Sequence, residues 1–460
     1  MKKSLLTLSA FVLSIGAFAQ TPGPFWNNLL NTNFAVPSVA SIYMDVVDAN
    51  VVWATGLYGT GRGSEYFTRT TNGGTSFTAG NIFPDTLLWH VSSIDALDAN
   101  NAWVAAYRNA PSSTATIDVI YHTVNGGVNW TDGGNTSMFT DAAAFANWVA
   151  FVSPSVGIAM GDQNPTTGGK HEIWRTVNGG TTWTLVPAAN IPAVNGASDT
   201  GITDVYTTFG NNIWYGTGAG RIFRSTDAGQ TWSVSPSGNT GYILDIAFTT
   251  ASNGLCMAGN AGAFGMYKTT DGGATWTAIP VTNTTGRRTL CAVPGTNYYA
   301  SASFSNSATA PATISISYDN GTTWNGGGGS GIIGYLNMGF ANNAVGYAGV
   351  FSHSATASVG GMYKFSGQPL SVENTQSYAP TAINTYPNPS NGMVTVVLPL
   401  AKHGVDIIIT DMLGNVVFTD RAYSVNYTER TLNLQHLAKG VYNMNFISAT
   451  DRSYQKIIIE

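Results

Sequence analysis

The sequence predicts an all-β protein in which a seven-bladed β-propeller is followed by a small C-terminal β-sandwich. One short phrase recurs six times through the middle of the chain. A second element, made of an apolar segment, a polar turn and another apolar segment, occurs seven times. Beyond residue 383 this period ends and short strand-like runs follow. Regular units followed by an aperiodic segment indicate a repeat domain and a separate second domain.

The recurring phrase, which we call the repeat turn, reads Thr or Ser, any residue, Asn or Asp, any residue, Gly, two further residues and an aromatic residue. Its six Asn or Asp positions are Asn72, Asn125, Asn178, Asp227, Asp271 and Asp319. They lie 44 to 53 residues apart, which fits one four-stranded propeller blade per repeat.

The chemistry of the repeat turn predicts a structural role for these six side chains. Asn-Gly and Asp-Gly between strand-like runs are typical of tight hairpins, because glycine adopts the positive φ that such turns need. An Asn or Asp at the start of the turn can accept hydrogen bonds from backbone N–H groups. The closing aromatic residue is large and regularly spaced, so we expect it to pack on its own blade or on the neighbouring one.

The seven upstream elements exceed the six repeat turns by one. The seventh unit passes through residues 361–365, where the repeat turn is missing. Residues 25–34 look like the strand that follows a repeat turn elsewhere. We therefore predict that this N-terminal strand completes the last blade and removes a free sheet edge.

Composition limits the possible partners. Charged residues make up 9% of the chain, against about 25% in ordinary domains, and 12% aromatic residues argue against disorder. The net charge of −5 and the absence of a basic stretch predict no nucleic-acid partner. Six scattered His and two Cys residues have no metal-site spacing, and the glycine-rich stretches do not precede helical patterns, so we expect no metal and no cofactor.

The N-terminus has the pattern of a secretory signal peptide. Lys2 and Lys3 precede an apolar run over 5–18 and an Ala-x-Ala site that ends at Ala19. The run is too short to span a membrane, and we expect no transmembrane segment in the mature chain. Cys256 and Cys291 could pair in an oxidising compartment or remain two small buried thiols, and the sequence leaves both possibilities open.

The predicted domain layout has four parts. A signal peptide covers 1–19, the propeller 20–365, a polar linker 366–383 and the C-terminal module 384–460. The module contains several short runs of alternating apolar residues, which indicate strands.

The repeat turn resembles the Asp-box, or BNR repeat, of sialidases, of xyloglucanase-type glycoside hydrolases and of propellers such as the photosystem II assembly factors. The resemblance covers about residues 25–367. It implies a β-propeller with each box on the blade periphery, and it says little about activity.

The C-terminal module resembles a type IX secretion C-terminal sorting domain, type A. The matching segments are 386–392, 411–417, 432–437, 440–442 and 456–460. The resemblance implies a partner in the type IX secretion machinery, which recognises residues 384–460, and a protein that is secreted or attached to the outer-membrane surface. The alternative is an ordinary accessory β-sandwich.

The candidate ligand-binding residues lie where the inner strands of the predicted blades begin, since propeller ligands usually occupy the mouth of the central channel. They are Trp89, His90, Trp148, Asp199, Tyr242, Arg287, Arg288 and Tyr335. Aromatic rings with a few polar groups suit a glycan or protein ligand. The alternative is that these residues only pack and solvate the rim.

Catalysis is the competing hypothesis, and we identify no catalytic residue. Two carboxylates at a suitable separation could hydrolyse a glycosidic bond, and the inner strands carry Asp45, Asp95, Asp204 and Asp245. Their recurrence from unit to unit favours a scaffold role instead. A sialidase-like site also needs a Tyr–Glu pair and an Arg-Ile-Pro motif, but the propeller segment has only Glu65 and Glu172 and lacks the motif.

The sequence thus favours an exported propeller that binds a glycan or a protein without catalysis. A glycoside hydrolase, sialidase-like or xyloglucanase-like, is the alternative, and a purely structural surface module is the third hypothesis.

Overall fold

The computed structural model describes residues 26–34, 39–58, 63–83, 89–109, 116–133, 138–140, 145–164, 168–260, 263–281, 288–303, 312–330, 333–352, 361–365, 384–397, 405–411, 416–422, 429–448 and 452–460. The predicted signal peptide, the predicted linker and Arg287 lie outside these residues. The chain divides into two compact units, Met1–Ser371 and Val372–Glu460. The described secondary structure is almost entirely β, with one short 3₁₀ helix, η2 (Ala188–Asn190).

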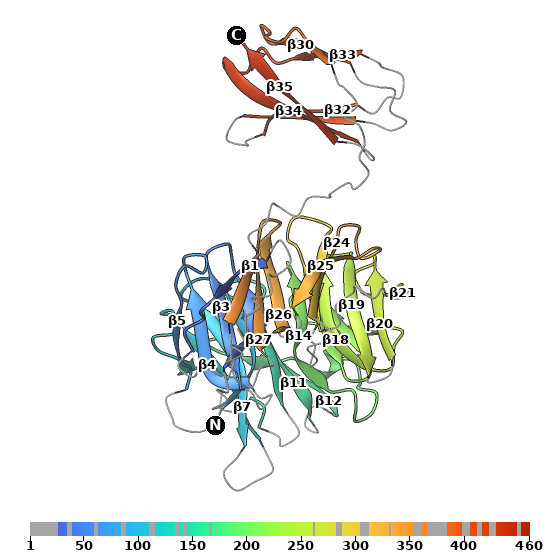
Figure 1. Cartoon of the computed structure of the whole chain (residues 1–460). Coiled ribbons are helices and arrows are strands. Elements are labelled where there is room, and N and C mark those ends of the chain that lie inside the picture. Colours follow the sequence, from blue (N-terminus) through green and yellow to red (C-terminus); the bar gives the residue numbers. More distant parts are fainter. Residues whose placement is uncertain are drawn as a thin grey trace, which may run out of the picture. The chain divides into compact units, whose positions relative to one another are not determined.

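The described strands of the first unit form four-stranded antiparallel sheets, which we number in chain order (Figure 1). The first three sheets consist of β2 (Ala40–Val46), β3 (Val52–Leu57), β4 (Gly63–Thr70) and β5 (Thr78–Asn81); β6 (His90–Ala96), β7 (Ala102–Asn109), β8 (Thr116–Thr123) and β9 (Thr131–Asp132); and β10 (Ala146–Phe151), β11 (Gly157–Asn164), β12 (Lys170–Thr176) and β13 (Thr184–Leu185).

The next three sheets repeat this order. They consist of β14 (Gly201–Phe209), β15 (Asn212–Thr217), β16 (Arg221–Ser225) and β17 (Ser233–Pro236); β18 (Tyr242–Phe248), β19 (Gly254–Asn260), β20 (Ala263–Thr269) and β21 (Thr277–Ile279); and β22 (Thr289–Ala292), β23 (Tyr299–Ala302), β24 (Ala312–Ser317) and β25 (Asn325–Ser330).

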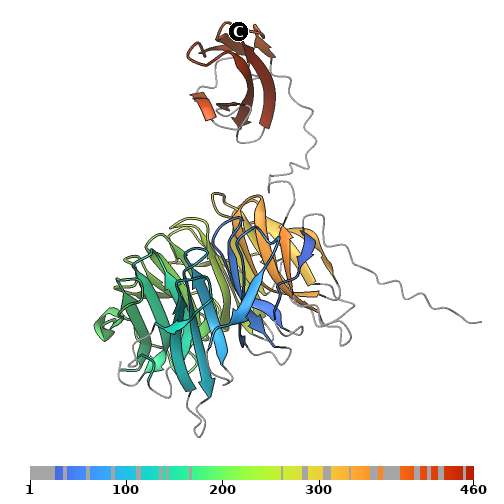
Figure 2. The same ribbon diagram turned by 90° about the vertical axis from the view of Figure 1, so that its left-hand side faces the viewer.

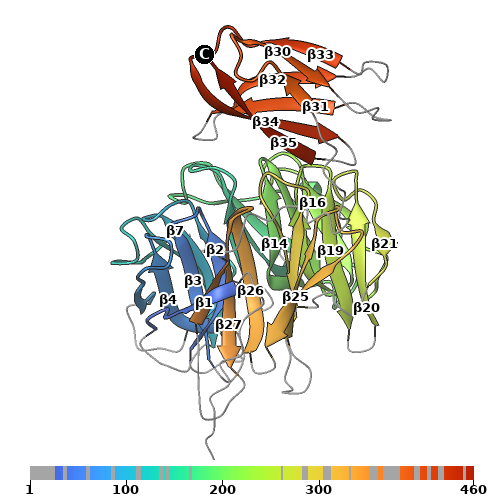
Figure 3. The same cartoon turned by 45° about the horizontal axis from the view of Figure 1, so that its top comes forward.

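The remaining sheet of this unit joins the two ends of the repeat region, and we call it the closing sheet. Its strands are β26 (Ile333–Asn342), β27 (Val345–Ser352), β28 (Gly361–Phe365) and β1 (Trp26–Leu30). β1 pairs antiparallel with β28, with Leu29 opposite Tyr363, and the blue strand lies among the orange ones in Figures 2 and 3. The N-terminal strand therefore occupies the outer position that a repeat turn and its following strand occupy in the other sheets.

The first strand of each sheet, which we call its inner strand, contacts the inner strands of its neighbours. The contacts run in ring order through β2, β6, β10, β14, β18, β22 and β26, and β26 contacts β2. Apolar side chains fill the space between adjacent sheets, as where Trp53 of the first sheet packs with Val104 of the second. Trp53 and Val104 are fully buried, so their hydrophobic surface contributes to joining one sheet to the next.

The repeat turns are held by a common set of hydrogen bonds. In the fifth sheet the Thr269 hydroxyl donates to Asp271 Oδ1 at 2.8 Å and accepts from Gly273 N at 2.8 Å. Asp271 Oδ1 also accepts from Thr275 N at 2.9 Å. The third turn has the same arrangement with Asn178 in place of the aspartate. The side chain at this position thus satisfies backbone N–H groups that the tight turn would leave unpaired.

The second unit contains two sheets. One described sheet consists of β29 (Asn384–Tyr386), β30 (Met393–Val397) and β33 (Glu429–Asn433). The other consists of β32 (Val416–Ala422), β31 (Val405–Thr410), β34 (Gly440–Ser448) and β35 (Arg452–Ile459). Both contribute to one buried cluster that includes Val396, Leu432, Ile409 and Phe446. The turn expected at 413–415 lies outside the described residues.

Candidate binding cavity in the channel

A cavity of about 470 Å³ lies among the inner strands of the first unit. Its walls come from β2, β6, β14, β18, β22 and β26 and extend to the segments that follow two of them, at Thr249 and Gly295. Four carboxyl groups, several threonine hydroxyls and the phenols of Tyr43 and Tyr206 line it. The lining is therefore rich in hydrogen-bonding groups and holds aromatic rings.

Two of the carboxylates connect one sheet to the next. Asp45 Oδ2 accepts the backbone N–H of Ala96 in the second sheet at 2.7 Å. Asp95 Oδ2 accepts the N–H of Phe151 in the third sheet at 3.0 Å. Asp45 and Asp95 occupy the same place in their strands, because each lies opposite a tryptophan of the adjoining strand. These bonds fit the scaffold role expected from their recurrence.

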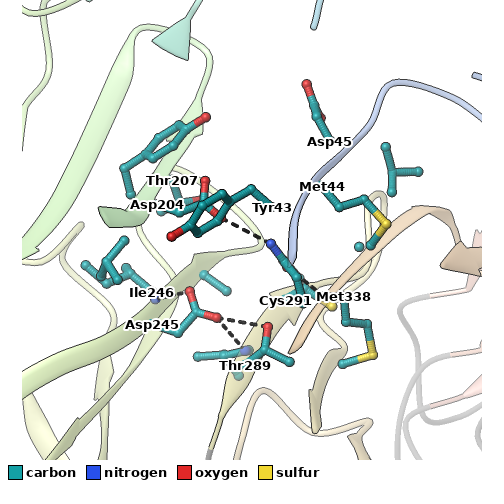
Figure 4. Close-up of a pocket in the computed structure, with 18 of the residues that line it drawn as sticks. Tyr43, Met44, Asp45, Asp204, Thr207, Asp245, Ile246, Thr289, Cys291 and Met338 are labelled. Carbon is teal, nitrogen blue, oxygen red and sulfur yellow. Dashed lines mark hydrogen bonds between the residues drawn. The ribbon is translucent and has the colours of Figure 1, made fainter. Parts of the chain in front are cut away.

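Asp245 makes a similar connection from a different position. Its Oδ2 accepts from Leu290 N at 2.7 Å and from the Thr289 hydroxyl at 3.1 Å, as Figure 4 shows. Asp245 lies opposite Met257 at a register shift in β18, two residues nearer the start of its strand than the Asp45 position. Asp204 and Asp245 thus lie at other levels of their strands than Asp45 and Asp95, because strand irregularities shift them.

Asp204 lies in a bulge of β14. Gly201 pairs with Thr217 and Tyr206 pairs with Tyr215, so the strand holds three more residues than its partner between these points. Asp204 has a φ of 60°, a left-handed conformation that is uncommon for a residue other than glycine. A bulge of this kind redirects side chains, and here it brings Asp204 to the cavity wall.

The bulge makes three hydrogen bonds across the channel. Asp204 Oδ2 accepts from Asn337 Nδ2 of the closing sheet at 3.1 Å. Thr203 accepts from the Tyr43 hydroxyl of the first sheet at 3.5 Å, and the Tyr206 hydroxyl donates to Asp95 Oδ1 at 3.4 Å. The fourth sheet is thus tied by hydrogen bonds to three sheets that are not its neighbours in the ring.

Burial sets the acidity of these groups. Desolvation raises the pKa of Asp45 and of Asp245 to about 6. Burial, followed by the nearby charges of Asp245 and Asp45, raises the pKa of Asp204 well above its ordinary value. Burial also raises the pKa of the Tyr43 phenol to about 12. Arg288 supplies a cationic group in the wall and partly offsets the raised pKa of Asp204.

Of the described candidate rim residues, Arg288 lines this cavity. Tyr242 is 56% exposed at the start of β18. Tyr335 is buried in β26, with its ring 6.4 Å from that of Tyr363. The cavity therefore takes most of its lining from parts of the inner strands that lie beyond the segments expected from the sequence.

The other candidates lie in packed surroundings. Trp89 is buried and stacks on Phe83 with ring centroids 4.6 Å apart, and His90 beside it is buried as well. Trp148 is fully buried and stacks on Tyr206, and Tyr206 lines the cavity. The position of Trp148 behind the wall connects it to the cavity only through the tyrosine.

Asp199 belongs to a buried polar network. It forms an ion pair with Arg221 and accepts a hydrogen bond of 2.5 Å from the Thr217 hydroxyl. Its backbone carbonyl is 2.6 Å from His171 Nε2, and burial lowers the pKa of His171 to about 4. A carboxylate with these partners holds the segment before β14 in place.

The two cysteines are free in this structure. Cys256 is buried in β19, and Cys291 lines the cavity from β22. Among the described residues, no group of three or more His, Cys, Asp or Glu side chains is arranged to hold a metal ion. No helix in the described part of the chain has the length and hydropathy to cross a membrane.

Comparison with solved structures shows a β-propeller fold. The structure "YCF48 bound to D1 peptide" has a TM-score of 0.52 at 13% identity and covers 76% of this chain and 100% of that one. "YCF48 from Cyanidioschyzon merolae" has a TM-score of 0.51 at 14% identity, covering 74% and 99%. "Crystal structure of RRP9 WD40 repeats" has a TM-score of 0.50 at 10% identity, covering 75% and 98%. Identities this low establish the fold and nothing about function.

The C-terminal unit has a family match. Residues 384–460 match the family described as "Secretion system C-terminal sorting domain". This match indicates export by type IX secretion, so the protein is secreted or attached to the outer-membrane surface. No curated protein matches the chain.

Proposed function

We propose that the chain is an exported seven-bladed β-propeller that binds a glycan or a polypeptide in its channel without cleaving it. One observation carries the choice of binding over catalysis. Asp45, Asp95 and Asp245 each accept a backbone N–H from a neighbouring sheet. A carboxylate that secures the scaffold is poorly suited to act also as a nucleophile or a general base, which must be free to reach its substrate.

The proposed architecture assigns a role to each part of the chain. A signal peptide over 1–19 directs export, and a propeller over 20–365 is closed by β1. The repeat turns are Asp-boxes with a structural role. A linker over 366–383 leads to a β-sandwich over 384–460, through which the type IX machinery recognises the protein.

The lining of the cavity supports the choice of ligand class. Hydroxyls and carboxyls can bind the hydroxyl groups of a sugar or the N–H groups of a peptide, and tyrosine rings offer apolar contact. Tyr242 and Arg288 are exposed candidates for contacts at the rim. One of the propellers with a similar fold is YCF48, whose structure was determined with a D1 peptide bound. A polypeptide ligand is therefore compatible with this type of scaffold.

A glycoside hydrolase, sialidase-like or xyloglucanase-like, is the second candidate. Asp204 favours it, because burial and neighbouring acids raise its pKa and a protonated carboxyl can act as a general acid. Such an enzyme would need a second carboxyl group or a Tyr–Glu pair free to act beside Asp204.

Product analysis distinguishes the two candidates. The purified chain would be incubated with sialylated glycans and plant β-glucans, followed by mass spectrometry of the soluble fraction. Binding predicts retention of protein on a glycan without sugar release, with retention reduced in Arg288→Ala and unchanged in Lys456→Ala of the other unit. Released sugar that disappears in Asp204→Asn would instead establish hydrolysis. If no sugar is released and no protein is retained, these glycans are excluded as ligands, and a polypeptide is left as the ligand of the channel.

A further inference from the structure

The channel cavity reaches the surface where the inner strands end. Phe209, the last residue of β14, lines the cavity and is 43% exposed. Pro294 and Gly295, which follow the end of β22, also line it and are exposed. We call this opening the strand-end mouth. An exposed aromatic ring at the opening of a cavity offers apolar contact to a ligand that enters there.

The wall of the cavity carries more acidic than basic groups. Asp45, Asp95, Asp204 and Asp245 line it (Figure 4), and Arg288 is the one basic residue among its described lining residues. Burial raises the pKa of Asp204, and the charges of Asp245, Asp45 and Asp95 raise it further, so the four carboxyl groups act on one another. A cavity with a surplus of one sign of charge attracts a ligand of the opposite sign. The wall therefore favours a cation over an anion.

The turns beside the strand-end mouth have the same sign of charge, and they are separate from the cavity wall. Seven described segments follow the inner strands, at 47–51, 97–101, 152–156, 210–211, 249–253, 293–298 and 343–344. Their charged residues are Asp48 and Asp98, and they contain no Lys, Arg or His. Acidic groups at an entrance raise the local concentration of cations. A cation would therefore be attracted at the entrance and again inside.

An organic cation fits this cavity better than a metal ion. Among the described residues, no three His, Cys, Asp or Glu side chains are arranged to hold a metal ion. Asp45, Asp95 and Asp245 each already accept a backbone N–H from a neighbouring sheet. They therefore act on a ligand mainly through their charge. A lysine or arginine side chain suits such a site, because its alkyl stem packs on apolar and aromatic groups while its charged end lies among acids.

We propose that the channel admits a polypeptide segment through the strand-end mouth and holds one of its lysine or arginine side chains among the four aspartates. This inference rests on the proposed function, because it names the ligand of the same cavity. Asp45 and Asp95 each precede the last residue of their strand, whereas Asp204 and Asp245 lie further from the strand ends. A basic side chain reaches past Phe209 to these deeper carboxyls on its stem, whereas the amino group of an amino sugar is attached directly to the ring.

Protonation of the wall should control this binding. Burial raises the pKa of Asp45 and of Asp245 to about 6. The other titratable or charged groups of the wall are Tyr43, Asp95, Asp204, Tyr206, Arg288 and Cys291, and β26 contributes none. As pH rises through about 6, Asp45 and Asp245 become charged, while lysine stays protonated until about pH 10. The affinity for a basic peptide should therefore increase as pH rises from about 5 to about 7.5.

The test measures calorimetric binding of the purified full chain to acetylated, amidated octapeptides of glycine and serine with lysine, arginine or glutamine at the two central positions. We expect the basic peptides to bind about tenfold or more tightly than the glutamine peptide. Asp204→Asn, which keeps an acceptor for Asn337, and Phe209→Ala should each weaken binding of the lysine peptide about threefold or more. Asp227→Asn is the matched control, because the first three repeat turns already have asparagine at this position. Its binding should equal that of the wild type.

The outcomes separate this inference from the proposed function. Equal binding of the lysine and glutamine peptides, an affinity that does not increase with pH, or an effect of Asp227→Asn as large as that of Asp204→Asn would overturn the inference. Binding of chitosan oligomers in place of the peptides would overturn the assignment to a polypeptide. If an uncharged peptide or glycan binds and Phe209→Ala weakens it, the inference fails and the proposed function stands. If no peptide and no glycan binds, both fail.

Thermal melting of each variant accompanies these measurements. Phe209 is exposed, so Phe209→Ala should melt near the wild type and tests the site even if Asp204→Asn does not fold.

Discussion

Two aspartates of this chain show how surroundings decide the acidity of one functional group. Asp204 is buried beside other carboxyls, and burial raises its pKa well above the ordinary value. Asp271 lies at the surface, where hydrogen bonds from the side chain and backbone of Thr275 lower its pKa to about 2. The two groups therefore affect stability in opposite directions as pH changes.

The protein should lose stability as pH rises, and the Asp204→Asn variant should lose less of it than the wild type. A carboxyl whose pKa is raised on folding contributes its full stability below the unfolded value of 3.8 and loses it as pH rises through the folded value. Asparagine can still accept from Asn337 but has no charge to bury. Melting temperatures from about pH 4 to pH 9 should show a growing advantage of the variant over this range.

Asp271→Asn is the control for this series. Its carboxylate contributes stability above pH 3.8 and loses it as pH falls toward about 2, so the variant should show no advantage in the alkaline range. If Asp204→Asn and the wild type show the same pH dependence, Asp204 does not ionise in the folded channel.

At the scale of the element, the repeat turn combines a side-chain acceptor with glycine in a conformation that other residues avoid. Gly127 has a φ of +83°, and a Cβ added to it would lie 2.2 Å from the Cζ atom of Phe67. Phe67 is 1% exposed in the core between the first two sheets. The turn therefore requires glycine for its backbone and also for close packing on the neighbouring sheet.

Gly127→Ala should destabilise the protein by about 2–4 kcal/mol, because a left-handed backbone and a core clash add together. Gly168→Ala provides the matched control, since Gly168 has a φ of +71° and nothing within 4 Å of an added Cβ. Gly168→Ala should lower the free energy of unfolding only by the cost of a left-handed backbone at alanine, about 1–2 kcal/mol. Urea unfolding of both variants measures the difference, and equal losses would show that Phe67 moves aside freely.

Removal of residues 20–36 tests the closing sheet. The deletion takes away β1 and leaves the hydrogen-bonding edge of β28 without its partner. An exposed edge strand promotes association between molecules. We expect a lower melting temperature and aggregation, followed by light scattering, whereas a chain lacking only 20–24 should behave as the wild type. An unchanged melting curve for the longer deletion would contradict closure by β1.

At the scale of the whole molecule, the two compact units have separate tasks. The first unit carries the channel cavity, and the second matches the sorting domain family. Each unit has its own buried cluster, as Val396 and Phe446 in the second show. Separate cores favour independent folding of the units.

A chain that ends at residue 371 should fold but fail to leave the cell. Its melting transition should match that of the first unit in the full chain, because the sorting domain contributes no strand to the described sheets of the first unit. Fractionation of a host that has type IX secretion should find it inside the outer membrane, with the full chain outside. Export of the truncated chain would show that residues 384–460 are dispensable.

The sequence predicted the strand segments well because the turn signals are local. Glycine and Asn or Asp at fixed spacing determine where a hairpin reverses, whatever the rest of the chain does. The pairing of β1 with β28 was also predictable, because one strand was missing at one end of the repeat and one was left over at the other. The sorting domain was recognisable from short ordered segments, and residues 384–460 have the matching family.

The cavity was harder to predict because it depends on strand register. Trp148 and Asp204 both lie on inner strands and both can form hydrogen bonds. Trp148 is nevertheless buried, whereas a bulge places Asp204 in the wall of the cavity. A shift of one residue turns a side chain to the other face of a strand. The aspartates of the inner strands were the available signal for the cavity, because all four of them line it.

The sequence by itself determined the class of fold, the repeat unit, the closing strand and the route of export, since each follows from local turn chemistry or from a motif in order. Only the tertiary structure decided which side chains meet. Asp204 and Asn337 lie 133 residues apart and come together across the channel, as do Tyr43 and Thr203, which lie 160 residues apart. Such contacts depend on bulges and on the packing of one sheet against another, which no local pattern in the sequence encodes.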